Sequence, residues 1–563
     1  MKPGQICQNQ IPPGERFDKA GRQEGRKAEK QKVKLKIKVG THLCVREIKK
    51  GRPMKKSIYI FVLMVLCGII SCTRNEPLPN IIYILADDLG YGELGSYGQE
   101  KIETPHLDLL AENGMRFTQH YAGSAVCAPS RCILLTGKHG GHAFIRGNHE
   151  WGERGPVWDM TKSVNDPNLE GQYPMDPDEV TIAEYLQEAG YLTGMIGKWG
   201  LGGPLSESVP NTQGFDFFCG YNCQRQAHTY YPKFLWKNRE KIWLDNKLVV
   251  PGTKLSEGAD PLDPASYSDY TLNDYAPDVM FREAMNFIES SGEQPFFLYY
   301  ATTIPHAAIQ APQEWVDRYV SKFGDEEPYL GDKGYFPHRY PHAGYAAMVS
   351  YMDNNIGLMM DKLKELGKFD NTMVMFTSDN GPTYNGGTDS PWFNSAGPFR
   401  EDYGWGKGFL HEGGIRVPMI AHWPGKIKPG TVSDHISVFY DILPTLCDLT
   451  GIEPYTETDG LSFLPELLGQ EQEEHEFLFW EFPAYSGQQA VRMGQWKGLR
   501  TDIQKGNMDI QLFNLNEDIL EEKNVADKHA EIVEKIRAIM QKEHKQAELE
   551  RFRMEALGDE LSK

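Results

Sequence analysis

The most restrictive feature of the sequence is an uninterrupted apolar segment, Asn80–Ala86 (NIIYILA), which ends directly in Asp87-Asp88. A continuous apolar run of this length, without alternating polar residues, is typical of a parallel strand that is buried on both faces. Such a strand needs a neighbouring strand on each side and helices above and below. The segment therefore belongs inside a layered sheet, with two carboxylates at its C-terminal end.

Three further apolar segments have strand character, and amphipathic segments separate them. Strands that alternate with helices indicate an α/β fold with a mixed, mostly parallel sheet between helices. Ligands of such sheets bind beyond the carboxyl ends of the strands. Since Asp87-Asp88 and Ser378-Asp379-Asn380 each follow a strand, we expect them to share one site. The other predicted elements are strands Tyr191–Ile196, Phe296–Ala301 and Met373–Thr377, and helices Thr104–Asn113, Thr181–Ala189 and Ala343–Leu366.

The chain of 563 residues is too long for a single hydrophobic core, and its pattern changes near residue 465. Short segments with the character of antiparallel strands appear there, and a charged amphipathic helix follows them. We therefore expect a main α/β domain over residues 77–465 and a smaller C-terminal α+β subdomain over residues 466–563. The subdomain's predicted elements are strands Glu476–Trp480, Gln489–Met493 and Trp496–Arg500 and helix Ala530–Glu550.

Residues 54–72 have the features of an export signal. A basic start at Met54 is followed by an apolar run from Ile58 to Ile70, which is too short to span a bilayer comfortably. The ending Ile-Ile-Ser-Cys resembles a bacterial lipobox. It predicts a lipid on Cys72 and a periplasmic or outer-membrane, cell-surface location. An ordinary signal peptide and a short membrane anchor are the alternatives.

The first 53 residues are basic, whereas the rest of the chain is acidic. Residues 1–53 carry 15 Lys/Arg and 5 Asp/Glu, and the total net charge is −19, so the remainder carries about −29. We interpret residues 1–53 as a mis-called N-terminal extension before a true start at Met54; a basic arm is the alternative. The acidic remainder argues against nucleic-acid binding, which needs clustered Lys/Arg.

Outside these segments the cysteines are few and scattered. Five of them are too few for a disulfide scaffold, and no CxxC pair or zinc spacing is present. Cys219 and Cys223 have two interpretations, a disulfide formed after export or a pair of buried free thiols. The remaining three are Cys127, Cys132 and Cys447.

Four oxygen donors follow two of the predicted strands: Asp87, Asp88, Asp379 and Asn380. Hard oxygen ligands suit calcium or magnesium better than zinc. Each pair alone is also compatible with a turn or a helix cap. Their positions at the ends of two strands of one sheet indicate a shared metal site.

One short motif carries more specific chemical information. Cys127-Ala128-Pro129-Ser130-Arg131 is followed by Thr136-Gly137. A thiol beside a proline and an arginine is, by itself, compatible with an ordinary loop and a buried cysteine. The string C-x-P-S-R…T-G, however, resembles the signature of the type I sulfatases. These are the formylglycine-dependent, arylsulfatase A-like members of the alkaline phosphatase superfamily.

Other segments resemble the remaining motifs of that family, in the family's order, over roughly residues 77–530. The resemblance implies an alkaline-phosphatase-like fold and a sulfuric ester hydrolase of the bacterial carbohydrate-sulfatase type. The matching segments are Asn80–Asp88 for the first strand and its metal aspartates, Gly197-Lys198-Trp199 for the lysine motif, Pro305-His306 for the histidine loop, Ser378–Gly381 for the second metal pair, and Lys407 with His411–Pro418 for the lysine and glycine-rich segment.

The resemblance also implies a mechanism. A separate maturation enzyme would convert Cys127 to formylglycine, and one hydroxyl of the hydrated aldehyde would attack sulfur and displace the alcohol. The second hydroxyl would allow sulfate to be expelled. A calcium ion would lower the pKa of the nucleophile and polarise a sulfate oxygen. Its ligands would be residue 127 together with Asp87, Asp88, Asp379 and Asn380.

Four further residues receive roles by the same resemblance. Arg131 would hold the hydrated aldehyde, Lys198 and Lys407 would neutralise the sulfate oxygens, and His306 would protonate the leaving oxygen. Each of them alone is as compatible with an ordinary loop or surface residue. Their combination with the Cys127 motif is what assigns them to a site.

One position departs from the family's pattern. Many members have a histidine two residues after the motif lysine, where it assists the second hydroxyl, and this chain has Gly200 there. His142, His228 and His411 are the candidates to replace it. We place His142 and His228, ahead of His411, in the substrate-binding part of the site. Structural roles for these loop histidines, and weakened activity, are the alternatives.

An exported, lipid-anchored bacterial sulfatase usually serves glycan breakdown, which predicts a sulfated glycan as substrate. An aromatic and cationic stretch near Gln226–Trp236 is suited to stacking on a sugar, and a packed insertion is the alternative. A phosphonate or phosphodiester hydrolase of the same superfamily and a non-catalytic glycan-binding relative are the competing functions. Lys198 and Lys407 together favour sulfate esters. The residues of the stretch considered for sugar binding are Arg225, His228, Tyr230, Tyr231 and Trp236.

Overall fold

The apolar segment singled out in the sequence forms β1 (Asn80–Ala86), and all of its residues are buried. β1 pairs in parallel with β7 (Phe296–Ala301) on one side and with β8 (Thr372–Ser378) on the other. The computed structural model describes residues 77–562. The predictions for the extension 1–53, the signal 54–72 and the lipid on Cys72 concern residues outside that range.

The large sheet has the strand order β10-β2-β9-β8-β1-β7-β3-β4-β5-β6, and β11 also pairs with β2. Its centre is parallel, while β9 and the β4–β6 edge introduce antiparallel pairs. The predicted mixed, mostly parallel sheet is confirmed. The remaining strands are β2 (Met115–Tyr121), β3 (Leu192–Lys198), β4 (Phe217–Tyr221), β5 (Phe234–Lys237), β6 (Glu240–Trp243), β9 (Arg416–His422), β10 (Thr431–Ser433) and β11 (Ser437–Val438).

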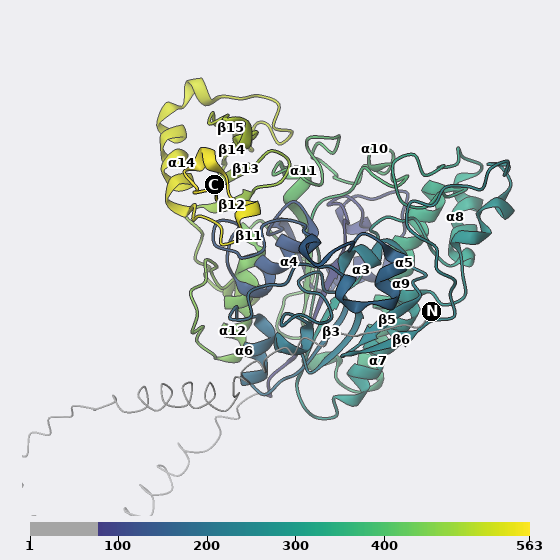
Figure 1. The fold of residues 1–563 in the computed structure, drawn as a ribbon. Coiled ribbons are helices and arrows are strands. Elements are labelled where there is room, and N and C mark those ends of the chain that lie inside the picture. Colours follow the sequence, from purple (N-terminus) through teal and green to yellow (C-terminus); the bar gives the residue numbers. More distant parts are fainter. Residues whose placement is uncertain (1–76, 563) are drawn as a thin grey trace, which may run out of the picture. The chain divides into compact units, whose positions relative to one another are not determined.

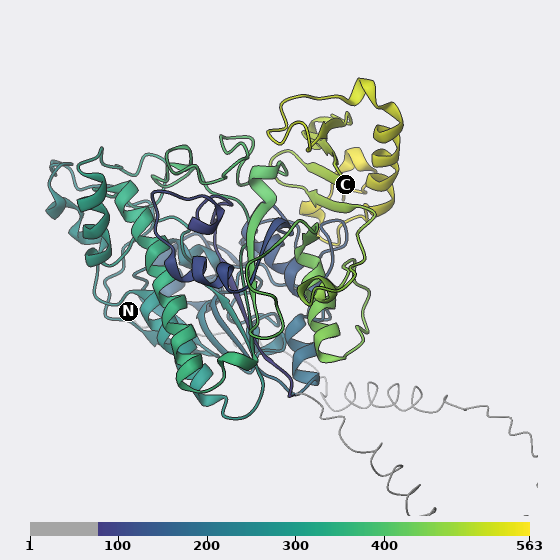
Figure 2. The same cartoon turned by 180° about the vertical axis from the view of Figure 1, so that it is seen from behind.

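Helices cover both faces of this sheet (Figure 1, Figure 2). Successive side chains of β1 point to opposite faces, so they belong to two different cores. Ile81, Tyr83 and Leu85 belong to a core shared with α4, α6 and α12. Ile82 and Ile84 belong to a second core with α3, α7, α8 and α9. The bounds are α3 (Pro105–Glu112), α4 (Cys127–Thr136), α6 (Ile182–Glu188), α7 (Ala276–Ser290), α8 (Gln313–Phe323), α9 (Pro341–Glu365) and α12 (Ile442–Thr450); shorter helices are α5 (Met160–Asn165), α10 (Ser390–Phe393), α11 (Glu412–Ile415) and α13 (Leu464–Leu467).

The C-terminal part forms a second, antiparallel sheet, as predicted, and α14 (Ala530–Glu543) covers one face of it. Trp480 of this sheet packs into the first core and donates its indole N–H to the Ala122 carbonyl oxygen at 2.9 Å. Its neighbour Phe479 points to the other face, against Ile536 of α14. The small sheet is therefore sandwiched between the main core and its own helix. Its strands are β12 (Leu478–Phe482), β13 (Gln488–Met493), β14 (Trp496–Arg500) and β15 (Gln511–Asn514).

The helix predicted over Ala530–Glu550 is shorter in the structure, because α14 ends at Glu543. His544 has extended backbone, and its ring contacts Glu481 at 2.8 Å and Asp559 at 3.1 Å. Arg146 also donates to the Lys545 carbonyl oxygen at 2.8 Å. These tertiary contacts direct the chain away from the helix axis, which the charged sequence pattern does not reveal.

The five cysteines in the described part of the chain are all buried free thiols. Of the two interpretations for Cys219 and Cys223, the structure therefore has the free thiols. Cys219 lies in β4, whereas the Cys223 sulfur lies 3.6 Å from a carboxylate oxygen of Glu150.

Lys497 links the small sheet to the main domain through a buried ion cluster. Its ammonium is fully buried and lies 2.9 Å from both Glu412 and Glu521. Removing one partner of a buried ion pair leaves an uncompensated charge, at a cost of about 3–5 kcal/mol. We expect Lys497→Ala to lower the thermal unfolding midpoint by a corresponding amount in calorimetry. Lys505→Ala, in an exposed pair with Asp502, is the control and should change little; equal midpoints for the two variants would contradict this role of Lys497.

Candidate active site

The two acidic segments meet at the C-terminal ends of adjacent strands, since Ala86 of β1 is level with Ser378 of β8. The Asp88 N–H donates to Asp379 at 3.1 Å, and the Asn380 amide donates to Asp88 at 2.9 Å. All four side chains are buried. The expected common site at the ends of the two strands is present.

A glycine-rich segment holds one of these loops in place. The Gly381 N–H donates to the Gly414 carbonyl oxygen at 2.9 Å. A Cβ atom on Gly381 would lie only 1.9 Å from the Gly413 carbonyl oxygen, so a larger residue would separate the two segments. The backbone approach expected of the glycine-rich segment therefore fixes the loop that carries Asp379 and Asn380.

Two cationic side chains, from α4 and from the end of β3, balance the negative charge of the carboxylates. Arg131, one turn along α4 from Cys127, donates twice to one oxygen of Asp379, at 3.1 and 2.8 Å. Lys198, at the end of β3, donates to Asp87 at 2.6 Å. Burial alone raises the pKa of Asp87, but the positive charges of Lys198 and Arg131 outweigh it and hold that pKa well below its usual range. Asp87 is therefore ionised at neutral pH.

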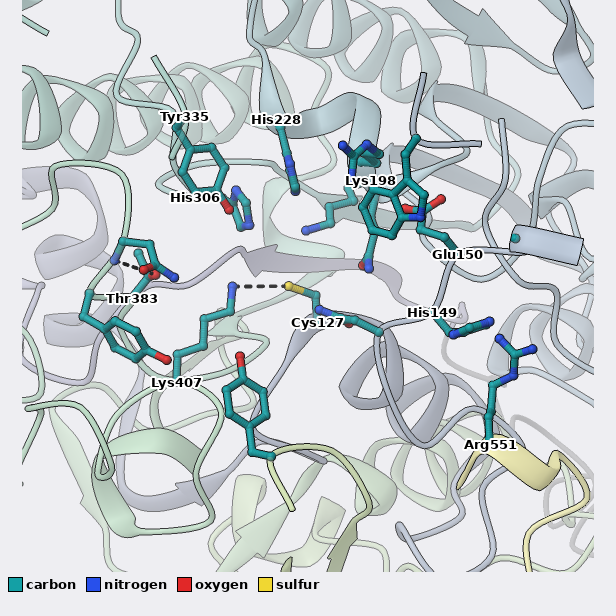
Figure 3. Close-up of a pocket in the computed structure, with 18 of the residues that line it drawn as sticks. Cys127, His149, Glu150, Lys198, His228, His306, Tyr335, Thr383, Lys407 and Arg551 are labelled. Carbon is teal, nitrogen blue, oxygen red and sulfur yellow. Dashed lines mark hydrogen bonds between the residues drawn. The ribbon is translucent and has the colours of Figure 1, made fainter. Parts of the chain in front are cut away.

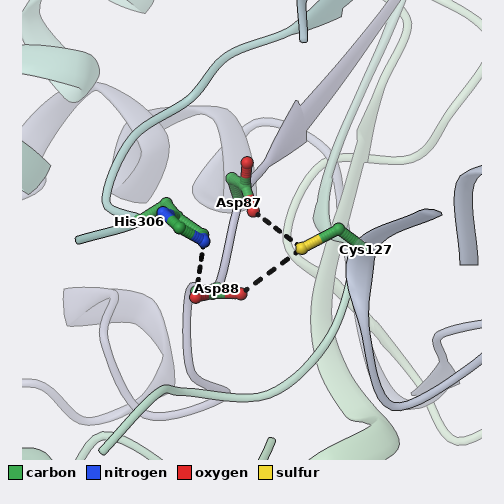
Figure 4. A group of neighbouring side chains, drawn as sticks. All are labelled: Asp87, Asp88, Cys127 and His306. Atoms are coloured by element: carbon green, nitrogen blue, oxygen red, sulfur yellow. Dashed lines mark hydrogen bonds and ion pairs between the residues drawn. The ribbon is translucent and has the colours of Figure 1, made fainter. Parts of the chain in front are cut away.

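Lys407 and His306 complete the cluster around Asp88. The Lys407 ammonium donates to Asp88 at 2.6 Å, and His306 Nε2 lies 3.7 Å from the same carboxylate. His306 and Cys127 approach Asp88 from opposite sides (Figure 4). Burial lowers the pKa of His306 to about 4, so the ring is neutral in the free protein.

Cys127 is the first residue of α4, and its sulfur lies at the centre of the cluster. The sulfur is 3.4 Å from Asp87, 3.9 Å from Asp88 and 3.7 Å from the Lys407 ammonium. Burial and the charge of Asp87 raise the pKa of this thiol well above its usual range. The unmodified thiol is therefore protonated at neutral pH, and a protonated thiol is a poor nucleophile.

The donor set around Cys127 fits a hard divalent cation. Asp87, Asp88, Cys127 and His306 each place one potential ligand atom within 4.8 Å of the others. In addition, the side-chain oxygen of Asn380 is buried and has no hydrogen-bond partner in the described chain. An orphaned amide oxygen beside two carboxylates is the environment that calcium or magnesium satisfies.

His228 lies beside the cluster, and its ring stacks on His306 with centroids 5.2 Å apart. Gly200, at the position where many family members have a histidine, has a φ of +76°, a conformation that strains residues with a side chain. A histidine at that position would therefore be strained. Of the three candidate replacements, the structure brings only His228 into the pocket of Cys127.

A pocket of about 760 Å³ opens above Cys127. Tyr335 and Thr383 lie on one side of it and Glu150, His149 and Arg551 on the other, with Cys127 between them (Figure 3). The sequence pattern did not single out these flanking residues. The other lining residues are Asn148, Gly152, Glu153, Trp158, Lys198, Gln224, Arg225, His228, His306, Tyr384, Asn385, Lys407 and Tyr485.

Comparisons with known proteins identify the family to which the chain belongs. The family model described as Sulfatase matches residues 79–452. The chain belongs to the sulfatase family. It is accordingly a sulfuric ester hydrolase with the alkaline-phosphatase-like fold of that family, as the motifs predicted. A second model, N-sulphoglucosamine sulphohydrolase, C-terminal, matches residues 401–548 of this sulfatase.

Individual relatives agree with the family assignment. Arylsulfatase A of Homo sapiens is 34% identical over 432 residues, which cover 74% of each chain. N-acetylgalactosamine-6-O-sulfatase of Bacteroides thetaiotaomicron is 30% identical over 522 residues, covering 83% of this sulfatase and 93% of the relative. Among solved structures, Ps i-CgsB in complex with k-i-k-neocarrahexaose has 26% identity and a TM-score of 0.62, covering 84% and 94% of the two chains.

His142 and His411 lie outside the pocket of the sulfatase. His142 Nδ1 contacts Asp459 at 2.8 Å, and its ring stacks on His139 with centroids 4.1 Å apart. His139, His142 and Asp459 bring three potential ligand atoms within 4.8 Å of one another, away from Cys127. His411 stacks on Trp405, 4.7 Å between centroids. The substrate-binding role expected of His142 thus has no geometric support.

The aromatic stretch near residue 230 is divided between core and pocket. Tyr230, Tyr231 and Trp236 are buried in the hydrophobic cores, so the packed-insertion interpretation describes them. Arg225 and His228 line the pocket. Aromatic character alone does not separate the two groups, because core and sugar-binding residues share it.

Metal binding can be tested at Asn380. We expect calcium to raise the thermal midpoint of the wild-type sulfatase, because a ligand that binds only the folded state stabilises it. Asn380→Ala removes one oxygen donor, and calcium affinity from calorimetric titration should fall about tenfold or more, where each factor of ten is about 1.4 kcal/mol. Asp459→Asn, in the other donor group, is the control. Unchanged calcium affinity in Asn380→Ala would contradict the assignment.

Proposed function

We propose that this sulfatase hydrolyses sulfate esters of carbohydrates, with residue 127 as nucleophile after conversion of its thiol to formylglycine and with calcium at the carboxylate cluster. The observation that carries the proposal is the position of the Cys127 sulfur. It lies within 4 Å of two carboxylates and one ammonium, at the floor of a pocket large enough for a sugar.

The state of the unmodified thiol supports the conversion. Its pKa is raised, so it is protonated at neutral pH and lacks the thiolate that attacks an ester. Formylglycine would supply a hydrated aldehyde, with one hydroxyl for attack on sulfur and a second for release of sulfate. Calcium, held by Asp87, Asp88, Asp379 and Asn380, would supply a positive charge that polarises a sulfate oxygen.

The chain's own cations receive the sulfate group. Lys198 and Lys407 each have one carboxylate contact at 2.6 Å and line the pocket, so both ammonium groups are available to sulfate oxygens. Arg131 is committed to Asp379 and to the Lys198 carbonyl oxygen, at 2.6 Å. Its contribution is to fix the metal-binding carboxylate and the strand end that carries Lys198.

His306 is placed to move the proton of the leaving group. The ring is neutral in the free enzyme, and a bound sulfate ester brings a negative charge next to it. Such a charge raises the pKa of a histidine and favours the protonated form. His306 would then donate its proton to the leaving sugar oxygen. His228, stacked on His306, takes the place of the histidine that Gly200 replaces and assists the second hydroxyl.

A carbohydrate substrate is supported by the relatives and by the pocket. The named relative from Bacteroides thetaiotaomicron is an N-acetylgalactosamine-6-O-sulfatase, and Ps i-CgsB was solved with a carbohydrate. The pocket lining combines aromatic rings with donors and acceptors, including Trp158, Tyr335 and Arg225. Aromatic rings with polar groups at their edges are suited to sugars.

Export, a maturation enzyme and the lipid on Cys72 are part of the same proposal and rest on the sequence. Across residues 77–562, no helix combines the length and apolar character that crossing a bilayer requires. The signal segment 54–72 supports export to the periplasm or the cell surface. In that location, a lipid on Cys72 would hold the enzyme at a membrane.

The nucleophile can be tested directly. After co-expression with a formylglycine-generating enzyme, we expect mass spectrometry of the Cys127 peptide to show the mass loss from thiol to aldehyde. Cys127→Ala should have no measurable release of sulfate from an ester, because neither hydroxyl of the hydrated aldehyde can form. Cys132→Ala, in the same helix, is the control. Full activity of Cys127→Ala would exclude the mechanism.

The two candidate histidines can be separated by kinetics. We expect His228→Ala to lower kcat about 10²–10⁴-fold, the usual contribution of a positioned proton-transfer group. His142→Ala should retain wild-type kcat, because His142 lies beside Asp459 and outside the pocket. Steady-state assays on one sulfate ester measure both. A large loss in His142→Ala with normal His228→Ala would reverse the assignment.

A further inference from the structure

Glu150 lies in the pocket wall, and few groups near its carboxylate donate hydrogen bonds to it. Its residue is 7% exposed, and within the described chain its hydrogen-bond partner is the Cys223 thiol, 3.6 and 3.8 Å from its two oxygens. A thiol is a weak donor, whereas an ionised carboxylate has about four acceptor sites. Burial raises the pKa of Glu150 to about 7. The side chain is therefore under-satisfied in the free enzyme.

Arg225 and Gln224, which also line the pocket, have unmet polar atoms. Arg225 Nε and Gln224 Oε1 are buried without hydrogen-bond partners in the described chain. The Arg225 guanidinium lies 3.7 Å over the ring of Trp158, which fixes its plane. No ion pair within 4 Å joins Arg225 to Glu150 among the described residues. The wall thus combines a carboxylate whose partner is a weak thiol donor with an unpaired acceptor, Gln224 Oε1, and an unpaired donor, Arg225 Nε.

These groups lie on one wall of the pocket, beside the site proposed for the sulfate. Figure 3 shows Glu150 on the far side of Cys127 from Tyr335 and Thr383, with Lys198 and His228 between them. A sugar whose sulfate contacts Lys198 and Lys407 would place its ring along this wall. Buried polar groups without partners cost free energy, and a ligand that supplies the partners recovers it.

We propose that Glu150 is a specificity residue that accepts hydrogen bonds from hydroxyl groups of the sugar unit carrying the sulfate, while Arg225 donates to a neighbouring oxygen of the same unit. This inference rests on the proposed function. A sugar carboxylate facing Glu150 would be repelled, so the substrate class is a sulfated neutral hexose or N-acetylhexosamine with free hydroxyls on the Glu150 side. Glu150 contacts substrate without contacting the reacting atoms.

The experiment compares two substrates in three enzymes. The substrates are N-acetylgalactosamine 6-sulfate and 4-nitrophenyl sulfate, which carries no sugar hydroxyls. The enzymes are wild type, Glu150→Gln and Glu170→Gln. Glu170 is a matched control, because it is 1% exposed and burial raises its pKa to about 7. It accepts a hydrogen bond of 2.8 Å from the Trp236 indole and does not line the pocket.

We expect Glu150→Gln to lower the ratio of kcat/KM for the sugar to kcat/KM for the aryl ester by about 10–100-fold, as expected when hydrogen bonds to a buried polar group are lost. Glu170→Gln should keep the wild-type ratio. Deoxy analogues of the sugar, each lacking one hydroxyl, should have a lower kcat/KM than the parent sugar in the wild-type enzyme. In Glu150→Gln, the analogue that lacks the hydroxyl bound by Glu150 should have the same kcat/KM as the parent sugar.

Other results would overturn the inference. Equal losses on both substrates would show that Glu150 only supports the structure, and an unchanged ratio would remove it from sugar recognition. Failure of the proposed function would give a different result, because wild-type enzyme with converted Cys127 would then release no sulfate from 4-nitrophenyl sulfate. A normal aryl sulfatase with an unaltered ratio in Glu150→Gln contradicts the role of Glu150 alone.

Discussion

The structure depends on burying three carboxylates at the ends of two parallel strands. Asp87, Asp88 and Asp379 are at most 1% exposed, a placement that is costly without paired charges. Arg131, Lys198 and Lys407 provide three positive charges, so the formal charges of the cluster balance before any ion binds. A divalent cation would give it a net charge of about +2 and make it attractive to an anionic sulfate ester.

Each compensating charge comes from a different element, so the fold is needed to assemble the cluster. Arg131 is carried by α4, Lys198 by β3, and Lys407 by the loop before α11. The parallel centre of the sheet brings the strand ends together, and α4 brings Cys127 to them. The second sheet adds Tyr485 to the pocket wall, and the segment after α14 adds Arg551. The reacting groups therefore lie at the ends of the central strands, at the start of α4 and in adjoining loops, and much of the substrate wall lies on more distant loops.

The sequence predicted the parts that obey a short-range rule. Phe296–Ala301 and Trp496–Arg500 were predicted with the bounds of β7 and β14, because their apolar pattern is continuous or alternating. The two metal pairs and Cys127 could be placed from motifs at strand and helix ends. The end of α14 could not, because contacts of His544 with distant residues decide it.

The pocket wall was largely beyond sequence reasoning. Tyr335, Tyr485 and Arg551 come from loops far apart in the chain, and no periodicity connects them. His142 and His228 were equal candidates, since both are loop histidines near aromatic or glycine residues. Their separation depends on Asp459, which pairs with His142 from more than 300 positions away. Glu150 had no distinguishing pattern, because its significance is the absence of donors around it.

The burial of Cys127 has a consequence for how the enzyme is made. The residue is 1% exposed at the start of a helix whose ten residues are all buried. A second protein cannot enclose such a side chain once the sheet and α4 have come together. The proposed conversion, which oxidises the Cβ carbon to an aldehyde and removes the sulfur, would therefore have to precede folding, while the segment is still an extended peptide. Under that proposal, molecules that fold first would be well structured but would keep the thiol, and the yield of active enzyme would depend on the relative rates of conversion and folding.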